Sequence, residues 1–290
     1  MGNTRFVGER ALVLGSGGLT GIAWELGLLA GLAGRGIDLT GADLVVGTSA
    51  GSVVGAQITS GAALAELYQA QLAPPNGAIS ASMSWQLQLR YLSAVLLSRN
   101  ATRARLRLGR ISLGSPPLPE EVRREVIAAR LPVHDWPAQR LLITAVDADT
   151  GEWTAFSAAD DAGLIEAVAA SCAVPGVWPP VRINGRRWMD GGMRSSANAD
   201  LAAGYERVVV LAPIAQGFRA LPSAARQSRA LTASGHTVAL ITPDRTAQAA
   251  VGGAMLDATR AAAAARAGQT QAASAAEAVA KVWAAGTLAP

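Results

Sequence analysis

Residues 43–51 read Asp-Leu-Val-Val-Gly-Thr-Ser-Ala-Gly, a short apolar run followed by the pattern Gly-x-Ser-x-Gly. The apolar run predicts a buried strand, and residues 52–58 after it can form a helix. A serine on a tight strand-to-helix turn is strained and exposes its hydroxyl, so small residues, here Gly47 and Gly51, must flank it. The pattern predicts a nucleophile elbow at Ser49, although an ordinary glycine-rich turn also fits this pentapeptide.

A second glycine-rich turn lies upstream, at residues 15–21, between a predicted strand at 11–14 and a predicted helix at 22–32. This strand, the helix and the strand before Ser49 form a βαβ unit, whose right-handed crossover places the two strands parallel and side by side. The carboxyl ends of parallel neighbours meet at one edge of the sheet. We therefore expect the upstream loop to lie beside Ser49.

The backbone N–H groups of this loop are candidates for stabilising negative charge. Gly17 and Gly18 can direct their N–H groups toward an oxyanion that develops when Ser49 attacks a carbonyl carbon. The N–H of Ala50, the residue after the nucleophile, is the other candidate donor. Preorganised donors of this kind stabilise a transition state by roughly 2.7–4 kcal/mol each. We predict an oxyanion hole at these three residues.

The same loop also resembles part of a dinucleotide-binding fingerprint, because Gly15-x-Gly17 follows a strand and precedes a helix. That fingerprint requires a third Gly or Ala where this chain has Thr20, and an acidic residue at the end of the second strand. The elbow occupies the end of the second strand, and Asp38 lies before that strand begins. We disfavour dinucleotide binding on these grounds.

A candidate base lies far along the chain, in the turn Asp190-Gly191-Gly192 after a strand-like hairpin at 181–189. Asp caps turns and Gly accepts positive φ, so an ordinary turn is one explanation of these residues. A carboxylate presented in this way can also reach a serine hydroxyl and act as its general base.

Four sequence features occur together in one order, and the set is far more specific than any single member. Together they resemble the patatin-like phospholipase family over about residues 11–212. The features are Gly17-Gly18-x-x-Gly21, Gly47-x-Ser49-x-Gly51, an Ala-Ser-x-Ala-x-Pro run at 170–175 with Pro179-Pro180, and Asp190-Gly191-Gly192.

This resemblance implies a three-layer α/β/α domain with a largely parallel central sheet, and a lipid acyl hydrolase that uses a Ser-Asp dyad without histidine or cofactor. It implies Ser49 as nucleophile, Asp190 as base, and the Gly17–Gly18 loop in the oxyanion hole. Thr20 departs from the family, which usually has Arg or Lys there, so recognition of phosphate or carboxylate by that position is in doubt. The glycines that support the three turns are Gly15, Gly21, Gly47, Gly51, Gly191 and Gly192.

Two alternatives remain open at this point. The order Ser49, Asp190, His236 matches that of an α/β-hydrolase triad. However, His236 precedes a predicted strand, whereas the histidine of a triad follows one, and the glycine loop after the first strand contains no histidine. The other alternative is a non-catalytic protein that binds acyl lipids on the same fold.

Composition fits a cytoplasmic enzyme that can also associate with the membrane periphery. The chain has 290 residues with a formal net charge of +4 and one cysteine, Cys172, which excludes an internal disulfide framework. The longest apolar stretch is too short to span a bilayer, and residues 1–10 lack the apolar core of a signal peptide. No metal-ligand pattern and no nucleic-acid-binding motif is present, so we expect no metal, no cofactor and no nucleic-acid partner.

A basic and apolar segment at 83–117 is a candidate lid or surface insertion. Large apolar residues recur at helical spacing at positions 85, 89, 92 and 96, and five arginines follow within residues 99–110. Such a segment can contact an anionic membrane surface. The alternative is a helix that faces the core, followed by a solvated basic loop.

Strands alternate with helical stretches along the rest of the chain, which predicts an α/β domain. We expect a catalytic core at 8–212. The remainder, 213–290, is expected to add a strand at 237–241 and Ala-rich helices that pack on the core.

Overall fold

The computed structural model describes residues 6–74, 84–215, 217 and 221–283. Within these residues, eight strands form one sheet in the order β5-β6-β3-β2-β1-β7-β8, with β4 also paired to β3. The strands are β1 Gly8–Leu14, β2 Leu44–Gly47, β3 Leu141–Asp147, β4 Trp153–Phe156, β5 Val181–Ile183, β6 Arg186–Asp190, β7 Tyr205–Leu211 and β8 Thr237–Ile241.

The centre of the sheet is parallel, and one end is antiparallel. Strands β3, β2, β1, β7 and β8 run parallel to their neighbours along this series. Strands β4 and β6 both pair antiparallel with β3, and β5 pairs antiparallel with β6. The predicted α/β fold with a largely parallel sheet is therefore confirmed, and the antiparallel hairpin β5–β6 carries the Asp190 turn at its end.

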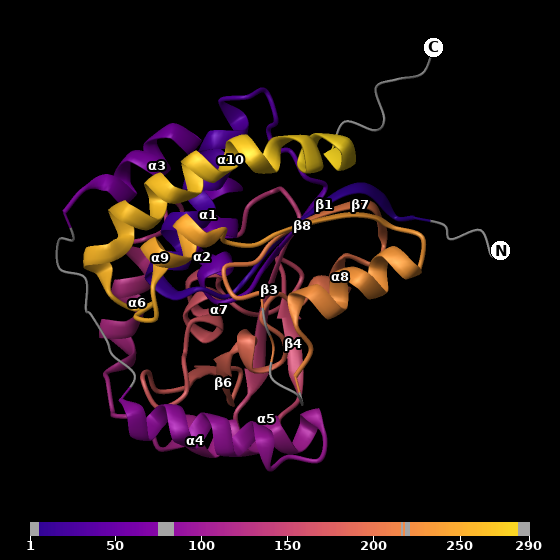
Figure 1. Cartoon of the computed structure of the whole chain (residues 1–290). Coiled ribbons are helices and arrows are strands. Elements are labelled where there is room, and N and C mark those ends of the chain that lie inside the picture. Colours follow the sequence, from indigo (N-terminus) through magenta and orange to yellow (C-terminus); the bar gives the residue numbers. More distant parts are fainter. Residues whose placement is uncertain (1–5, 75–83, 216, 218–220, 284–290) are drawn as a thin grey trace.

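Helices cover both faces of the sheet (Figure 1). The α-helices are α1 Gly18–Ala33, α2 Ala50–Ile58, α3 Leu64–Leu72, α4 Trp85–Leu96, α5 Ala101–Leu113, α6 Glu120–Ala128, α7 Leu164–Ser171, α8 Ala224–Ala233, α9 Arg245–Val251 and α10 Ala261–Trp283. Short 3-10 turns are η1 Gly191–Met193, η2 Ala199–Ala202 and η3 Ala258–Arg260.

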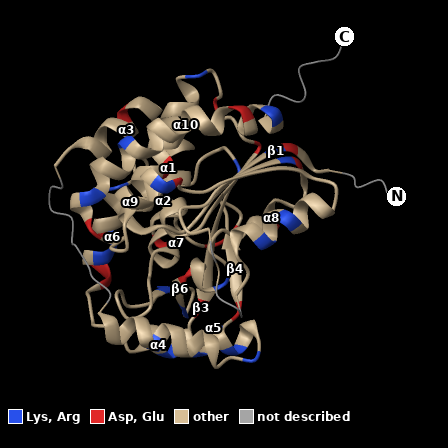
Figure 2. Ribbon diagram, viewed as in Figure 1, with Lys and Arg blue, Asp and Glu red and all other residues tan. Residues whose placement is uncertain are grey.

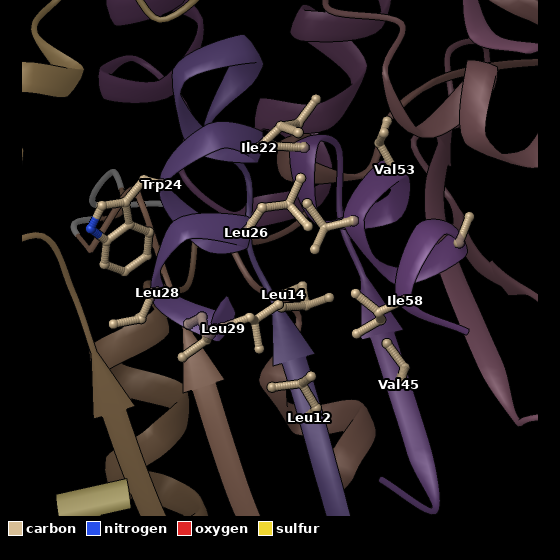
Figure 3. Close-up of a cluster of buried hydrophobic side chains, with 14 of the residues drawn as sticks. Leu12, Leu14, Ile22, Trp24, Leu26, Leu28, Leu29, Val45, Val53 and Ile58 are labelled. Carbon is tan, nitrogen blue, oxygen red and sulfur yellow. The ribbon is translucent and has the colours of Figure 1, made fainter. Parts of the chain in front are cut away.

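The alternation of side chains along β1 divides the core between the two faces. Leu12 and Leu14 pack with α1, α2, α7 and α10 on one face. Ala11 and Val13 pack with η2 and α8 on the other face. Figure 3 shows the first of these clusters, in which the side chains of β1 meet Leu26 of α1. Because residues 11–14 of β1 are buried on both faces, they form a continuous apolar run rather than an alternating one.

The Ala-rich C-terminal stretch forms α9, η3 and α10, and α10 packs closely against α1 (Figure 1). Glycine makes this close approach possible. A Cβ atom built on Gly27 of α1 would lie 2.0 Å from the carbonyl oxygen of Ala265, and one on Gly268 of α10 would lie 2.3 Å from the carbonyl oxygen of Trp24. The two helix backbones are therefore in direct contact.

The structure at 84–113 differs in two respects from the alternative of a core-facing helix followed by a solvated basic loop. Met83, the first residue of the predicted segment 83–117, lies outside the described residues. The arginine-rich part is not a loop but helix α5, which Asn100 caps by accepting a hydrogen bond from the Arg103 N–H. The apolar residues at 85, 89, 92 and 96 do not face the core but are exposed. The opposite side of α4, which includes Leu87 and Tyr91, is buried instead.

Replacement of Gly27 by Ala tests the contact between α1 and α10. Helix propensity alone favours Ala over Gly by about 1 kcal/mol. The added Cβ atom would nevertheless force the two helices apart, so we expect the free energy of unfolding to fall by about 1–3 kcal/mol. Urea denaturation measures this change.

The matched control is Gly41→Ala, because a Cβ atom at Gly41 has no other atom within 4 Å. That variant should change the free energy of unfolding by less than about 0.5 kcal/mol. A Gly27→Ala protein as stable as the wild type would show that the two helices do not require this close approach.

Candidate active site

Ser49 occupies a strained turn between β2 and α2. Its φ of 53° lies in the left-handed region, which a side chain with a Cβ atom rarely adopts. The flanking glycines have a steric reason: a Cβ atom at Gly47 would lie 2.6 Å from the Gly51 carbonyl oxygen, and one at Gly51 would lie 2.1 Å from the Leu14 carbonyl oxygen. The structure thus places Ser49 at the apex of the turn that the sequence predicts.

Hydrogen bonds hold the backbone of Ser49 on both sides of its Cα atom. The Ser49 N–H donates to the Ser171 hydroxyl oxygen over 2.9 Å, and the Ser49 carbonyl accepts from the Ser52 hydroxyl over 2.6 Å. Ser171 ends α7, so the Ala-Ser run noted in the sequence supports the turn directly. The Cys172 thiol also donates to the Ser49 carbonyl, over 3.3 Å. Burial raises the pKa of Cys172 to about 11, so this thiol is neutral at ordinary pH.

Asp190 ends β6 and lies against the Ser49 side chain. Its carboxylate accepts a hydrogen bond from the Gly192 N–H over 2.7 Å and interacts with the Ser49 hydroxyl. Only 2% of the residue is exposed. Burial raises its pKa from 3.8 to about 6, although the hydrogen bonds from Ser49 and Gly192 and the charge of Arg123 act in the opposite direction. The carboxylate is therefore a stronger base than an exposed Asp, yet largely ionised at neutral pH.

Asn198 connects the serine turn to the Asp190 turn. It is fully buried, and its side-chain amide donates to the hydroxyl oxygens of Thr48 and Thr144 over 3.0 Å and 3.1 Å, and to the Gly191 carbonyl over 3.3 Å. Thr48 directly follows β2, Thr144 lies in the middle of β3, and Gly191 directly follows β6. The sequence analysis did not identify Asn198, and the only signal for it is an amide side chain soon after Asp-Gly-Gly. In the structure, Asn198 has a left-handed backbone conformation, which Asn tolerates.

The upstream glycine loop lies next to Ser49, as the crossover argument predicts. Gly17, Gly18 and Ala50 line the same cavity as Ser49 and Asp190. In the part of the chain that the structure describes, the backbone N–H groups of these three residues have no hydrogen-bond acceptor. They are therefore available to a bound molecule.

Glu25, which the sequence analysis did not identify, binds the first residue of this loop from inside the core. The side chain is fully buried, and its carboxyl group accepts a hydrogen bond from the Gly15 N–H over 2.9 Å. Burial raises the pKa of Glu25 well above its ordinary value, which favours the neutral acid. The first glycine of the loop is thereby held by a buried carboxyl group inside the core.

A cavity of about 550 Å³ opens over Ser49 and Asp190. Its walls are mainly apolar and come from α1, α2, α4, α6 and the segment before η3. They include Leu19, Ile22, Val53, Leu92, Ile127 and Leu256. A serine hydroxyl, a buried base and unpaired N–H groups beside an apolar cavity form a site suited to acyl transfer from a hydrophobic ester.

The histidines lie away from this arrangement. Both ring nitrogens of His236 contact backbone carbonyls, those of Leu231 and Ala203, rather than Asp190. His134 is exposed and contacts the Ala128 carbonyl. The structure therefore gives no support to a triad that includes His236.

Among the described residues, no group of three or more His, Cys, Asp or Glu side chains is placed to hold a metal ion. No helix in the same part of the chain is long and apolar enough to cross a bilayer.

Comparison with known proteins supplies the family. Solved structures with a similar fold include VipD from Legionella pneumophila, at 14% identity and a TM-score of 0.37 over 71% of this chain and 50% of that one. Another is the type III effector protein ExoU, at 19% identity and a TM-score of 0.41 over 94% of this chain and 53% of that one. The chain thus spans about half the length of these two proteins. No curated protein sequence matches significantly. The family model described as patatin-like phospholipase matches residues 12–203, and the chain therefore belongs to the patatin-like phospholipase family.

Proposed function

We propose that this protein hydrolyses carboxylic esters of lipids, as a phospholipase A, lysophospholipase or esterase, through an acyl-enzyme on Ser49 with Asp190 as general base. One observation carries the proposal: the hydroxyl of the strained Ser49 turn contacts a buried carboxylate whose pKa is raised to about 6, at the base of an apolar cavity. Membership of a lipid acyl hydrolase family supports it.

The first half-reaction forms the acyl-enzyme. Asp190 accepts the proton of the Ser49 hydroxyl while the serine oxygen attacks the ester carbonyl carbon. The negative charge on the carbonyl oxygen is stabilised by the free N–H groups of Gly17, Gly18 and Ala50. Asp190 then donates the proton to the departing alcohol, which leaves the acyl group on Ser49.

The second half-reaction releases the acid. Asp190 accepts a proton from a water molecule that attacks the acyl-enzyme carbonyl carbon, and the proton returns to the serine oxygen as the bond breaks. A base with a pKa near neutrality serves both steps, since it must accept and donate the same proton.

Ser49→Ala tests the nucleophile. The variant should lose hydrolysis of p-nitrophenyl butyrate and covalent labelling by a fluorophosphonate, because no other described serine lies in an elbow with a base beside it. Both assays should read at background, while circular dichroism stays that of the wild type. Wild-type turnover in Ser49→Ala would rule out the acyl-enzyme on this residue, and a wild-type protein that binds esters without turnover would favour the lipid-binding alternative.

Asp190→Asn tests the dyad against a triad. The amide keeps the shape of the turn but cannot accept the serine proton, so kcat/KM should fall by about 10²–10⁴-fold. His236→Ala should retain most of the activity, because both ring nitrogens of His236 contact backbone carbonyls rather than Asp190. A loss in His236→Ala equal to that in Asp190→Asn, at unchanged stability, would support the triad.

The raised pKa of Asp190 predicts that the free energy of unfolding depends on pH. The folded protein holds the Asp190 proton more tightly than the unfolded chain, so ionisation of Asp190 lowers stability as pH rises from about 4 to about 6. A rise in pKa from 3.8 to about 6 corresponds to about 3 kcal/mol, at about 1.36 kcal/mol for each pKa unit. Asp190→Asn should therefore be more stable than the wild type at pH 8, by up to that amount, and the difference should vanish below pH 4.

Urea denaturation at several pH values measures this effect, with the exposed Asp135→Asn as the matched control. In the wild type, the acidic limb of kcat/KM should have a midpoint near pH 6. If the stability difference between Asp190→Asn and wild type were the same at pH 4 and pH 8, ionisation of Asp190 would not lower the free energy of unfolding.

The outer face of α4 and α5 is suited to a lipid surface. The α4 stripe, defined as Trp85, Leu89, Leu92 and Leu96, is exposed by 42–67% along one side of the helix. Leu92 also lines the cavity, so the stripe reaches the entrance of the site. Residues 84–119 contain six arginines and no Asp or Glu, and Figure 2 shows the basic positions on α4 and α5 at one end of the molecule, opposite α10. We infer that this face contacts anionic lipid.

Replacement of Arg99, Arg103 and Arg110 by Gln tests the lipid contact. All three are exposed, whereas Arg105 is omitted because its Nε donates to the Gly151 carbonyl. Each arginine near an anionic surface contributes about 1 kcal/mol, so binding to phosphatidylserine vesicles should weaken by about 100-fold, and salt should weaken wild-type binding as well.

The control is Arg266→Gln on α10, an exposed arginine at the other end of the molecule. It should bind vesicles as the wild type does. Hydrolysis of soluble p-nitrophenyl butyrate should persist in the triple variant. Equal losses on vesicles and on the soluble ester would indicate a structural role for α5 instead.

A further inference from the structure

Position 20 cannot supply a charge to the cavity. The family usually has a basic residue there, and this chain has Thr20, which is fully buried and does not line the cavity. Its N–H donates to the Met255 carbonyl, and its hydroxyl has no partner in the described part of the chain. Any recognition of an anionic substrate must therefore come from another element.

Two arginines line the cavity from another side. Arg123 lies on α6 and Arg130 follows the end of that helix, and both line the cavity that contains Ser49 and Asp190. Arg123 is only 6% exposed. Burial lowers the pKa of both guanidinium groups.

Neither arginine has a carboxylate within 4 Å among the described residues. Arg123 donates one Nη2–H to the Cys172 carbonyl over 3.0 Å and lies over the Trp178 ring at 4.8 Å, but its Nε has no partner. The neighbouring Arg124, by contrast, points to the surface and pairs with Glu166 over 2.8 Å. Burial of a guanidinium with no carboxylate in contact is costly, so an anion in the cavity would offset that cost.

We propose that Arg123 and Arg130 form a subsite for the phosphate ester of the substrate headgroup. This rests on the proposed function, since it assigns the headgroup of the lipid whose ester Ser49 attacks. Guanidinium groups bind phosphate oxygens through paired N–H donors, which suits them to this chemistry better than to neutral groups.

The position of Arg123 relative to the nucleophile fits this assignment. Arg123 donates to the carbonyl of Cys172, and the thiol of Cys172 donates to the carbonyl of Ser49. Cys172 is therefore hydrogen-bonded both to the Arg123 guanidinium and to the backbone of Ser49. In a glycerophospholipid, the phosphate and the nearer acyl ester are also only a few bonds apart, so one molecule can reach both groups while its acyl chain occupies the apolar walls.

A purely electrostatic role for Arg123 would have different consequences. Its charge acts to lower the pKa of Asp190. Loss of that charge would raise the pKa of the base and alter turnover of every ester equally. Loss of a headgroup contact would instead alter only the preference between a phosphate-bearing ester and a neutral one.

The first arm of the test measures that preference. The ratio of kcat/KM for monomeric dihexanoyl phosphatidylcholine to kcat/KM for dihexanoylglycerol is compared between wild type, Arg130→Gln and Arg123→Gln. We expect the ratio to fall by about 10-fold to 100-fold in either variant, the range for loss of a charge-assisted hydrogen bond. Arg124→Gln, on the same helix but outside the cavity, should keep the wild-type ratio. An unchanged ratio in Arg130→Gln would overturn the proposal, whether or not Arg123→Gln folds.

The second arm measures binding without turnover and is independent of the proposed function. In a Ser49→Ala background, calorimetry compares dihexanoyl phosphatidylcholine, dihexanoylglycerol and inorganic phosphate. Tighter binding of the phospholipid than of the neutral lipid, lost with Arg130→Gln and kept with Arg124→Gln, would support the subsite even if no ester were hydrolysed. Equal binding of the two lipids would overturn it. Arginine-dependent binding of inorganic phosphate alone, with no preference for the phospholipid, would also overturn the assignment to a headgroup.

Discussion

The contact between the end of β1 and the serine turn is the constraint on which the rest of the site depends. The N–H of Thr48 donates to the Leu14 carbonyl, and the N–H of Gly51 donates to the Gly15 carbonyl. Gly51 lies so close to Leu14 that no side chain fits between them. These contacts join the first two strands at their carboxyl ends. The glycine loop after β1 and Ser49 after β2 consequently share one cavity, and the strained φ of Ser49 is maintained by packing on both sides.

The hairpin at the antiparallel end of the sheet completes the site. Strand β6 pairs with β3 so that Ala145 lies opposite Asp190, and this register sets how far the carboxylate extends along the sheet edge. Gly191 is required where the chain then turns, since a Cβ atom there would lie 2.3 Å from the Thr144 hydroxyl oxygen. Asn198 donates to both Thr144 and Gly191 and so fixes the turn to the strand. Asp190 and Ser49 thus follow strands of opposite direction, and the buried side-chain amide of Asn198 binds both turns.

Buried ionisable groups around the cavity perform different tasks because their surroundings differ. Asp190 retains hydrogen-bond donors and a distant positive charge, which limits the rise of its pKa to about 6. Glu25 accepts a hydrogen bond from the Gly15 N–H, and burial raises its pKa well above the ordinary value. Arg123 and Arg130 keep their charge in an apolar wall with no carboxylate within 4 Å in the described part of the chain. Each of these groups lowers stability relative to an apolar residue, so a role in binding or chemistry accounts for them better than a role in folding.

The sequence alone determined the features that depend on local backbone geometry. Turns that need glycine on both sides of Ser49, or directly after Asp190, leave a readable pattern because no other residue fits, and the apolar runs of buried parallel strands do the same. Tertiary structure alone decided which side of α4 faces the core. The helix has apolar residues on both sides, Leu87 and Tyr91 on one and Leu89 and Leu96 on the other, and periodicity cannot rank two apolar faces. It also decided the roles of Asn198, Glu25 and Arg123. Asn198 and Arg123 have partners far away in the chain, Thr48 and Cys172 among them. A polar residue type by itself does not indicate whether the fold will bury it beside this cavity.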